Sequence, residues 1–144
     1  MTPTTAILRS DDRLEASDAH ARRRILLVDD SAPQRMLLAK MLTGWGYAVV
    51  EAASGAEALE VALRQEIDIV LSDWVMPGMT GVEFCRAFRA LERRRYGYFV
   101  LLTSKSDKED VALGLDSGAD DFLTKPVNSG ELRARLMAGE RIMG

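Results

Sequence analysis

Polar side chains capable of chemistry stand at four places in the chain, each directly after an apolar run. They are Asp29 and Asp30, Asp73, Thr103 and Ser104, and Lys125. If three carboxylates met in one crevice, each close pair would repel by about 1 kcal/mol in water and by about 4 kcal/mol at an effective dielectric constant of roughly 20. Protonation of one acid or binding of a hard divalent cation would relieve this repulsion.

Magnesium suits this set of residues, because it binds a few carboxylate oxygens, keeps part of its water shell and shares the rest with a phosphate. A carboxylate can also attack phosphorus and form a mixed anhydride. Asp73 stands alone on its strand, so we expect it to be the nucleophile, with Asp29 and Asp30 holding the metal. Thr103 would supply a hydroxyl and Lys125 a positive charge, since phosphoryl transfer depends on positioning and charge neutralisation.

The elements that must position these residues follow a regular pattern. Apolar runs cover residues 25–28, 47–50, 67–71, 98–102 and 119–123. After each run comes a capping residue with Gln or Glu three positions later: Ser31 with Gln34, Ser54 with Glu57, Thr80 with Glu83, Ser106 with Glu109, and Asn128 with Glu131. Such a pair satisfies free N–H groups at a helix start. Gly44 is expected to close the first helix, and Gly114 or Gly118 the fourth.

The spacing of these signals predicts an α/β fold. Five strand–helix units in succession make a parallel sheet with helices on both faces. The first, third and fourth runs are the most continuously apolar and are expected at the centre. The second run is short and ends in Glu51, which suits one sheet edge. The fifth run carries Asp120 and Asp121, which suits the other edge, where exposed charge discourages pairing with other chains. We therefore predict a flavodoxin-like doubly wound (βα)5 three-layer sandwich with strand order 2-1-3-4-5, whose ligands bind at the carboxyl ends of the strands.

Composition limits the possible functions. The net charge of −3 gives no positive field for nucleic acid, so we expect no direct nucleic-acid binding. One cysteine, Cys85, and one histidine, His20, cannot build a disulfide or a multi-cysteine metal site. With no membrane span or signal peptide in the pattern, a cytoplasmic protein is expected. Residues 1–22 are expected to be a flexible tail and 23–144 one domain, with the basic residues 22–24 and the charged residues 92–95 exposed to solvent.

From Ile25 to about Ile142 the chain resembles the receiver domains of bacterial two-component response regulators. The matching motifs are residues 25–31 (ILLVDDS), 72–81 (SDWVMPGMTG), 101–104 (LLTS) and 120–126 (DDFLTKP). Each motif is weak by itself, but the four together are highly specific. The resemblance assigns residues 23–144 to one CheY-like receiver domain.

The resemblance implies that Asp73 is the phosphoacceptor and that Asp29, Asp30, Asp73 and the Val75 backbone carbonyl hold Mg²⁺. It implies that Lys125 pairs with the phosphoryl group, that Thr103 and Phe122 form the switch, and that the bond between Lys125 and Pro126 is cis. The implied donor is a sensor histidine kinase or a histidine phosphotransfer protein. The implied role is signalling rather than enzymatic, with self-catalysed phosphorylation and dephosphorylation. The face made by the fourth helix, fifth strand and fifth helix would then bind a second copy, an output protein or an output domain.

Two other functions fit parts of the pattern. An aspartate-nucleophile phosphatase of the haloacid dehalogenase type would place its acids two residues apart, whereas Asp29 and Asp30 are adjacent, and no cap domain is expected. An interaction module that is never phosphorylated would not need the complete set of acids, threonine and lysine. The C-terminal segment is similar to receivers that continue into a diguanylate cyclase domain, and a stand-alone receiver, a fragment and a phosphorelay carrier all stay open. Val75 and Lys105 depart from the commoner family pattern beside the phosphorylation site, which leaves the phosphoryl lifetime open, and Phe122 lacks the hydroxyl that a tyrosine would offer for a hydrogen bond.

Overall fold

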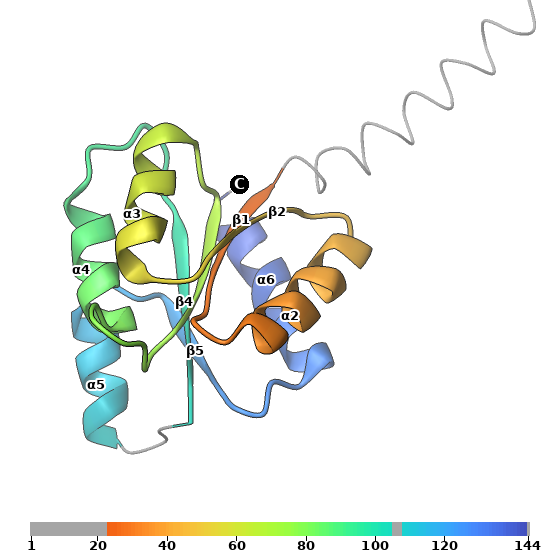
Figure 1. Ribbon diagram of the computed structural model, residues 1–144. Coiled ribbons are helices and arrows are strands. Elements are labelled where there is room, and N and C mark those ends of the chain that lie inside the picture. Colours follow the sequence, from red (N-terminus) through yellow and green to blue (C-terminus); the bar gives the residue numbers. More distant parts are fainter. Residues whose placement is uncertain (1–22, 105–107, 144) are drawn as a thin grey trace, which may run out of the picture.

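A five-stranded parallel sheet forms the centre of the computed structural model, which describes residues 23–104 and 108–143, without the side chains of 108–111 (Figure 1). The strands are β1 (Arg24–Val28), β2 (Ala48–Ala52), β3 (Ile69–Asp73), β4 (Tyr98–Thr103) and β5 (Asp121–Thr124). They pair in the order β2-β1-β3-β4-β5. The predicted flavodoxin-like fold and strand order are confirmed. The expected tail and the Ser106 cap lie outside the described residues.

Helices cover both faces of this sheet, as Figure 1 shows. They are α2 (Ala32–Gly44), α3 (Gly55–Arg64), α4 (Gly81–Ala90), α5 (Lys108–Asp116) and α6 (Ser129–Met143). Helices α2 and α6 lie on one face, and α3, α4 and α5 lie on the other. Among the described residues, no helix has both the length and the apolar character that crossing a bilayer requires.

The hydrophobic core is divided by the sheet into two clusters. In β1, Leu26 and Val28 belong to the cluster that includes Phe84, whereas Ile25 and Leu27 belong to the cluster that includes Leu136. Successive side chains of a strand point to opposite faces, so a strand with helices on both sides must be apolar throughout. The residues of β3 and β4 are all buried, which confirms their predicted central positions.

Four of the predicted helix caps are present in the structure. The side chains of Ser31, Ser54, Thr80 and Asn128 each accept a hydrogen bond from the backbone N–H three residues later. The Glu83 carboxylate also accepts from the N–H of Thr80 at 2.9 Å, which completes a capping box. Each helix after β1, β2, β3 and β5 therefore begins a few residues beyond the end of its strand.

Two expectations about helix ends are refined by the backbone. Gly44 is the last residue of α2, but the left-handed conformation belongs to Gly46, whose φ is 98°. After α5, the left-handed glycine is Gly118, with φ of 107°, and Gly114 lies inside the helix. A position with positive φ just beyond a helix favours glycine, because glycine has no Cβ to clash with the backbone.

The interpretation of Asp120 as an exposed edge charge is wrong. Asp120 precedes β5, and its Oδ2 accepts hydrogen bonds from the Phe99 N–H and from Arg89 Nη2, both at 2.8 Å. The Tyr96 hydroxyl donates to its other oxygen. Arg89 also donates to the carbonyls of Gly118 and Gly97. Asp120 therefore anchors the start of β5 to β4 and α4.

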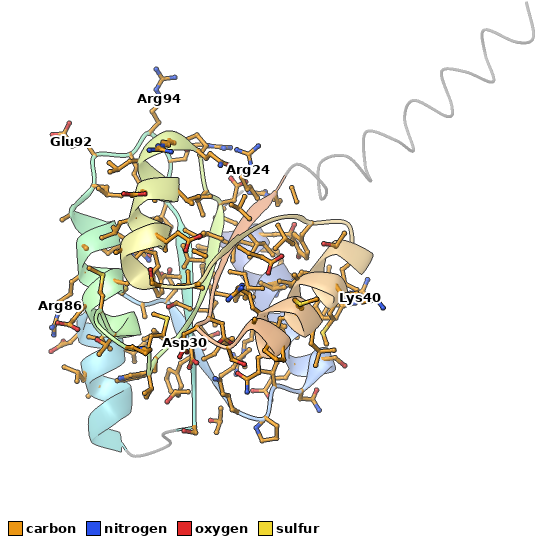
Figure 2. All side chains as sticks on the ribbon, in the orientation of Figure 1. Arg24, Asp30, Lys40, Arg86, Glu92 and Arg94 are labelled. Atoms are coloured by element: carbon orange, nitrogen blue, oxygen red, sulfur yellow. The ribbon has the colours of Figure 1, made fainter. Side chains whose placement is uncertain are left out.

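The interpretation of residues 92–95 as a solvated stretch is also wrong in part. The Arg93 side chain is only 11% exposed. Its guanidinium lies 4.5 Å from the Phe88 ring centroid and donates to the carbonyl of Ile67. Arg95 pairs with the buried Asp68 at 3.2 Å. These two arginines attach the loop after α4 to the amino end of β3, whereas Glu92 and Arg94 are exposed at this end of the domain (Figure 2).

Candidate functional site

The ends of β1 and β3 bring the three predicted carboxylates together. The register pairs Val28 with Ser72, so the residues that follow them, Asp29 and Asp73, are neighbours at the carboxyl edge of the sheet. One carboxylate oxygen from each of Asp29, Asp30 and Asp73 lies within 4.8 Å of the others. Figure 2 labels Asp30 at this edge, opposite the end of the domain that carries Glu92 and Arg94.

Asp29 is the most constrained of the three acids. It is buried, and its Oδ1 accepts a hydrogen bond from the Ser31 N–H at 2.9 Å. Its Oδ2 is buried without a hydrogen-bond partner among the described residues. Burial raises the pKa of the Asp29 carboxyl, the Ser31 hydrogen bond lowers it, and the charge of Asp73 raises it again. A buried carboxylate that has an oxygen without a partner and lies beside two further carboxylates fits a hard cation such as Mg²⁺.

Lys125 supplies the positive charge of the site. Its Nζ lies 2.9 Å from Asp73 Oδ2 and 3.4 Å from Gln34 Oε1. Its backbone N–H donates to the carbonyl of Thr103 at 2.7 Å, and the Lys125–Pro126 peptide bond is cis, as the resemblance implied. One ammonium offsets only one of the three carboxylate charges, so the cluster still favours a cation.

Thr103 and Phe122 lie on the two strands nearest to Lys125. Thr103 is the last residue of β4, is buried and pairs in register with Thr124. Phe122 lies opposite Leu101 and is partly buried against the cluster of α3 and α4. The Thr103 end of β4 therefore adjoins the lysine loop. The switch role of these two residues stays a prediction.

The loop after β3 exposes Val75 and turns Trp74 inward. The Val75 side chain is exposed, whereas Trp74 is buried and its carbonyl accepts from the N–H of Gly81 at 2.8 Å. A Cβ on Gly81 would overlap the carbonyl oxygen of Asp73, so glycine allows α4 to begin against this backbone. The expected metal contact of the Val75 carbonyl stays a prediction.

Two residues that contact the site are not among the predicted site residues. Arg35 Nη1 donates to the carbonyl of Asp29 at 2.7 Å, and Gln34 contacts Lys125. Gln34 was interpreted only as the partner of the Ser31 cap. Both residues lie one turn or less after Ala32, where α2 begins, and this nearness to Asp29 and Asp30 was the available signal.

An apolar groove adjoins the lysine side of the site. It has a volume of about 240 Å³ and is lined by Gln34, Leu37, Leu38, Met41, Lys125, Pro126 and Val127. Two larger hollows, of about 360 and 350 Å³, are lined by the ends of α3 and α4 and the loops that follow them, and include none of the three clustered acids. The groove of α2 therefore shares Lys125 with the charged site.

Comparison with known proteins identifies the family. Residues 25–137 match the family model of the response regulator receiver domain. The chain belongs to this family.

Curated relatives and solved structures agree with this assignment. The receiver is 42% identical over 117 residues to the DNA-binding response regulator MtrA of Mycobacterium tuberculosis, covering 81% of this chain and 50% of that protein. It is 38% identical to the phosphate regulon transcriptional regulatory protein PhoB of Pseudomonas aeruginosa, covering 85% and 53%. The chemotaxis protein CheY4 of Vibrio cholerae superposes with a TM-score of 0.76 at 36% identity, covering 80% and 96%. The chain spans about half the length of MtrA and PhoB.

Membership gives the receiver its general role in two-component signalling. Accepting a phosphoryl group is the function of the family, and this is a signalling role rather than that of an enzyme. Receiver domains generally use Mg²⁺ at an acidic pocket, and Asp29, Asp30 and Asp73 form an acidic cluster in this chain. Response regulators act with histidine kinases and output domains.

Proposed function

We propose that this receiver accepts a phosphoryl group on Asp73, with Mg²⁺ held by Asp29, Asp30, Asp73 and the backbone carbonyl of Val75. One observation carries the proposal: the three carboxylates converge within 4.8 Å at a sheet edge where the Lys125 ammonium is 2.9 Å from Asp73 Oδ2. Asp73 is the proposed nucleophile, because it is the acid that the Lys125 ammonium contacts, and this ammonium can also pair with a phosphoryl oxygen.

In the proposed reaction, a carboxylate oxygen of Asp73 forms a bond to phosphorus while the bond from phosphorus to the donor's leaving group breaks. The products are an aspartyl phosphate and the released leaving group, which is the imidazole when the donor is a phosphohistidine. Bound Mg²⁺ would supply positive charge to the phosphoryl oxygens. The Lys125 ammonium would neutralise part of the negative charge on the phosphoryl oxygens, and the Thr103 hydroxyl would donate a hydrogen bond to one of them.

We further propose that the chain catalyses its own phosphorylation from small donors and its own dephosphorylation. The acids, the lysine and the threonine all come from one chain, so only the cation must be added. Incubation with acetyl phosphate and MgCl₂, followed by intact-mass measurement, should show addition of one phosphoryl group, which decays after the donor is removed.

Matched variants test the assignment of Asp73. Asp73→Asn should show no addition, and chelation of Mg²⁺ should abolish it in the native chain. Asp68→Asn is the control, because Asp68 is also a buried aspartate but precedes β3 at the opposite edge of the sheet. Undiminished addition to Asp73→Asn would remove the proposal.

The protein donor is proposed to be a sensor histidine kinase or a histidine phosphotransfer protein that covers the groove of α2. The donor must bring phosphorus to Asp73, and this groove continues from Lys125 with exposed apolar surface, including Leu37 at 66% exposure. Leu37→Asp should slow transfer from a phosphorylated histidine phosphotransfer protein and leave phosphorylation by acetyl phosphate unchanged. Equal slowing with both donors would place the defect in the site instead.

The response is proposed to run through Thr103 and Phe122 to the face made by α5, β5 and α6. Exposed apolar side chains on these helices include Leu113 and Leu115 of α5 and Met137 of α6. Phosphorylation should alter homodimerisation or binding of an output protein there. Sedimentation velocity with and without beryllium fluoride, a phosphoryl mimic, measures this change. Identical sedimentation and partner affinity would count against it.

The domain boundary is also a proposal. Residues 23–144 should fold and accept phosphate without residues 1–22, because all the site residues and both core clusters lie beyond residue 22. A chain that begins at Arg23 should retain the thermal transition and the phosphorylation rate of the full chain. Loss of either property would show that the first segment belongs to the domain.

A further inference from the structure

Both backbone groups of Asp29 are held by other elements. Its N–H donates to the carbonyl of Ala52 at 3.1 Å, which ties it to the end of β2. Its carbonyl accepts from Arg35 Nη1 at 2.7 Å. The side chain is held as well, because Oδ1 accepts from the Ser31 N–H. The only Asp29 oxygen without a hydrogen-bond partner among the described residues is Oδ2, and the Asp29 carboxylate belongs to the acidic cluster.

Arg35 has two further contacts besides its hydrogen bond to the Asp29 carbonyl. Its Nε lies 3.1 Å from Glu51 Oε1, and its backbone N–H donates to the carbonyl of Ser31 at 2.9 Å. The Arg35 side chain is 17% exposed, so this ion pair is screened less than a fully exposed one. Glu51 pairs in register with Leu27 of β1. The guanidinium therefore joins α2, β2 and the segment that follows β1.

The bond to the Asp29 carbonyl has a direct consequence for Asp30. The Asp29 carbonyl and the Asp30 N–H belong to one planar peptide unit. A hydrogen bond from Arg35 to that carbonyl oxygen therefore constrains the orientation of the peptide that leads into Asp30. Asp30 is exposed, so burial does not hold its side chain. The position of its carboxylate relative to Asp29 and Asp73 depends on this peptide plane.

We propose that Arg35 is a positioning residue that sets the Mg²⁺ affinity of the receiver by orienting the Asp29–Asp30 peptide. The proposal rests on the proposed metal site. Planar guanidinium is suited to this task, because two of its N–H groups donate in fixed directions to the Asp29 carbonyl and to Glu51. Partners that orient metal ligands commonly change metal affinity about 10- to 100-fold when they are removed.

The sign of the effect separates positioning from simple electrostatics. Arg35→Met removes a positive charge near the acids, so electrostatics alone predicts tighter Mg²⁺ binding. Positioning predicts the opposite, a Kd at least about tenfold higher. A titration with MgCl₂, followed by backbone amide chemical shifts of the full chain, measures this Kd. The rate of phosphorylation by acetyl phosphate should return to the wild-type value at saturating Mg²⁺, because Arg35 does not contact Asp73.

Two further variants complete the design. Arg35→Lys keeps the charge and loses the planar fork, so its Kd should also rise, and it replaces Arg35→Met if that variant does not fold. Lys40→Ala is the matched control, since Lys40 is an exposed cation on the same helix that points away from the domain in Figure 2. Its Kd should equal that of the wild type or fall slightly.

The outcomes are distinct. An unchanged or lower Kd in Arg35→Met and Arg35→Lys, with a lower melting temperature, would overturn the proposal and leave Arg35 a purely structural link. A wild-type chain that neither binds Mg²⁺ nor accepts phosphate would instead overturn the proposed function. Higher Kd values in the two Arg35 variants, together with recovery of the rate at saturating Mg²⁺, would support the positioning role.

Discussion

The Lys125 ammonium lies 2.9 Å from Asp73 Oδ2 although β4 separates the strands that lead to the two residues. Lys125 directly follows β5, and its N–H donates to the carbonyl of Thr103, which holds the lysine beside the end of β4. The lysine thus reaches the one acid of the cluster that we propose as the nucleophile. Its positive charge should weaken Mg²⁺ binding and speed phosphoryl transfer.

Lys125→Met should therefore separate these two steps. Mg²⁺ should bind at least about fivefold more tightly, because about 1 kcal/mol of repulsion between cation and ammonium is lost even in water. Phosphorylation by acetyl phosphate should slow about 100-fold, since a donor to the phosphoryl oxygens is missing. An MgCl₂ titration and an intact-mass time course measure the two effects. Weaker Mg²⁺ binding would contradict the assigned position of the lysine.

Asp29→Asn should stabilise the metal-free domain and remove the effect of Mg²⁺ on stability. The variant lacks a buried charge that two other carboxylates repel, so the free energy of unfolding should rise by roughly 1 kcal/mol. In the wild type, Mg²⁺ at roughly ten times Kd should add about 1.4 kcal/mol, and this gain should disappear in the variant. Urea unfolding with and without MgCl₂ tests both statements. Equal stabilisation of both proteins by Mg²⁺ would place the metal elsewhere.

The start of α4 should not tolerate a Cβ. Gly81→Ala places a methyl group on the Asp73 carbonyl oxygen, so the free energy of unfolding should fall by about 1–3 kcal/mol and phosphorylation should slow as the backbone shifts. Gly44→Ala is the control, because nothing lies within 4 Å of its Cβ and alanine favours a helix by up to about 1 kcal/mol. Urea unfolding measures both changes. A fully stable Gly81→Ala would show that the helix can begin elsewhere.

Arg89→Ala should destabilise the fold without weakening the metal site. The variant loses hydrogen bonds to Asp120, Gly118 and Gly97 and leaves a half-buried carboxylate with fewer partners, at a cost of about 2–4 kcal/mol. The network lies at the amino end of β5, so the Mg²⁺ Kd should match that of the wild type. Chemical denaturation and an MgCl₂ titration give the two values. A raised Kd would reveal coupling between the two ends of the sheet.

The arrangement of helices and strands could be predicted, because it depends on helix caps of a few residues and on the apolar character of whole strands. Ser54 lies three residues before Glu57, and such a cap forms wherever the segment becomes helical. The continuous apolar run of β4 indicates helices on both faces, which places it at the centre of the sheet. The meeting of Asp29 and Asp73 followed from the strand order, since adjacent parallel strands end at the same edge.

Other features could not be predicted, because the partners come from distant parts of the chain. Asp120 and Arg93 carry charges and were interpreted as exposed, yet the fold brings the Phe99 N–H to the first and the Phe88 ring to the second. The contact of Arg35 with the Asp29 carbonyl depends on where α2 begins and how its first turn faces the sheet. A charged residue in a sequence shows no partner until both elements are placed.

By itself, the sequence determined the five strand–helix units and the kinds of side chain at each strand end, because capping and hydrophobic patterning act over a few residues. Only the tertiary structure decided which oxygen of Asp29 lacks a partner and which acid pairs with Lys125. Hydrogen bonds and ion pairs require atoms to lie within a few tenths of an ångström of their optimal separation. For residues far apart in the chain, register and helix placement set that separation.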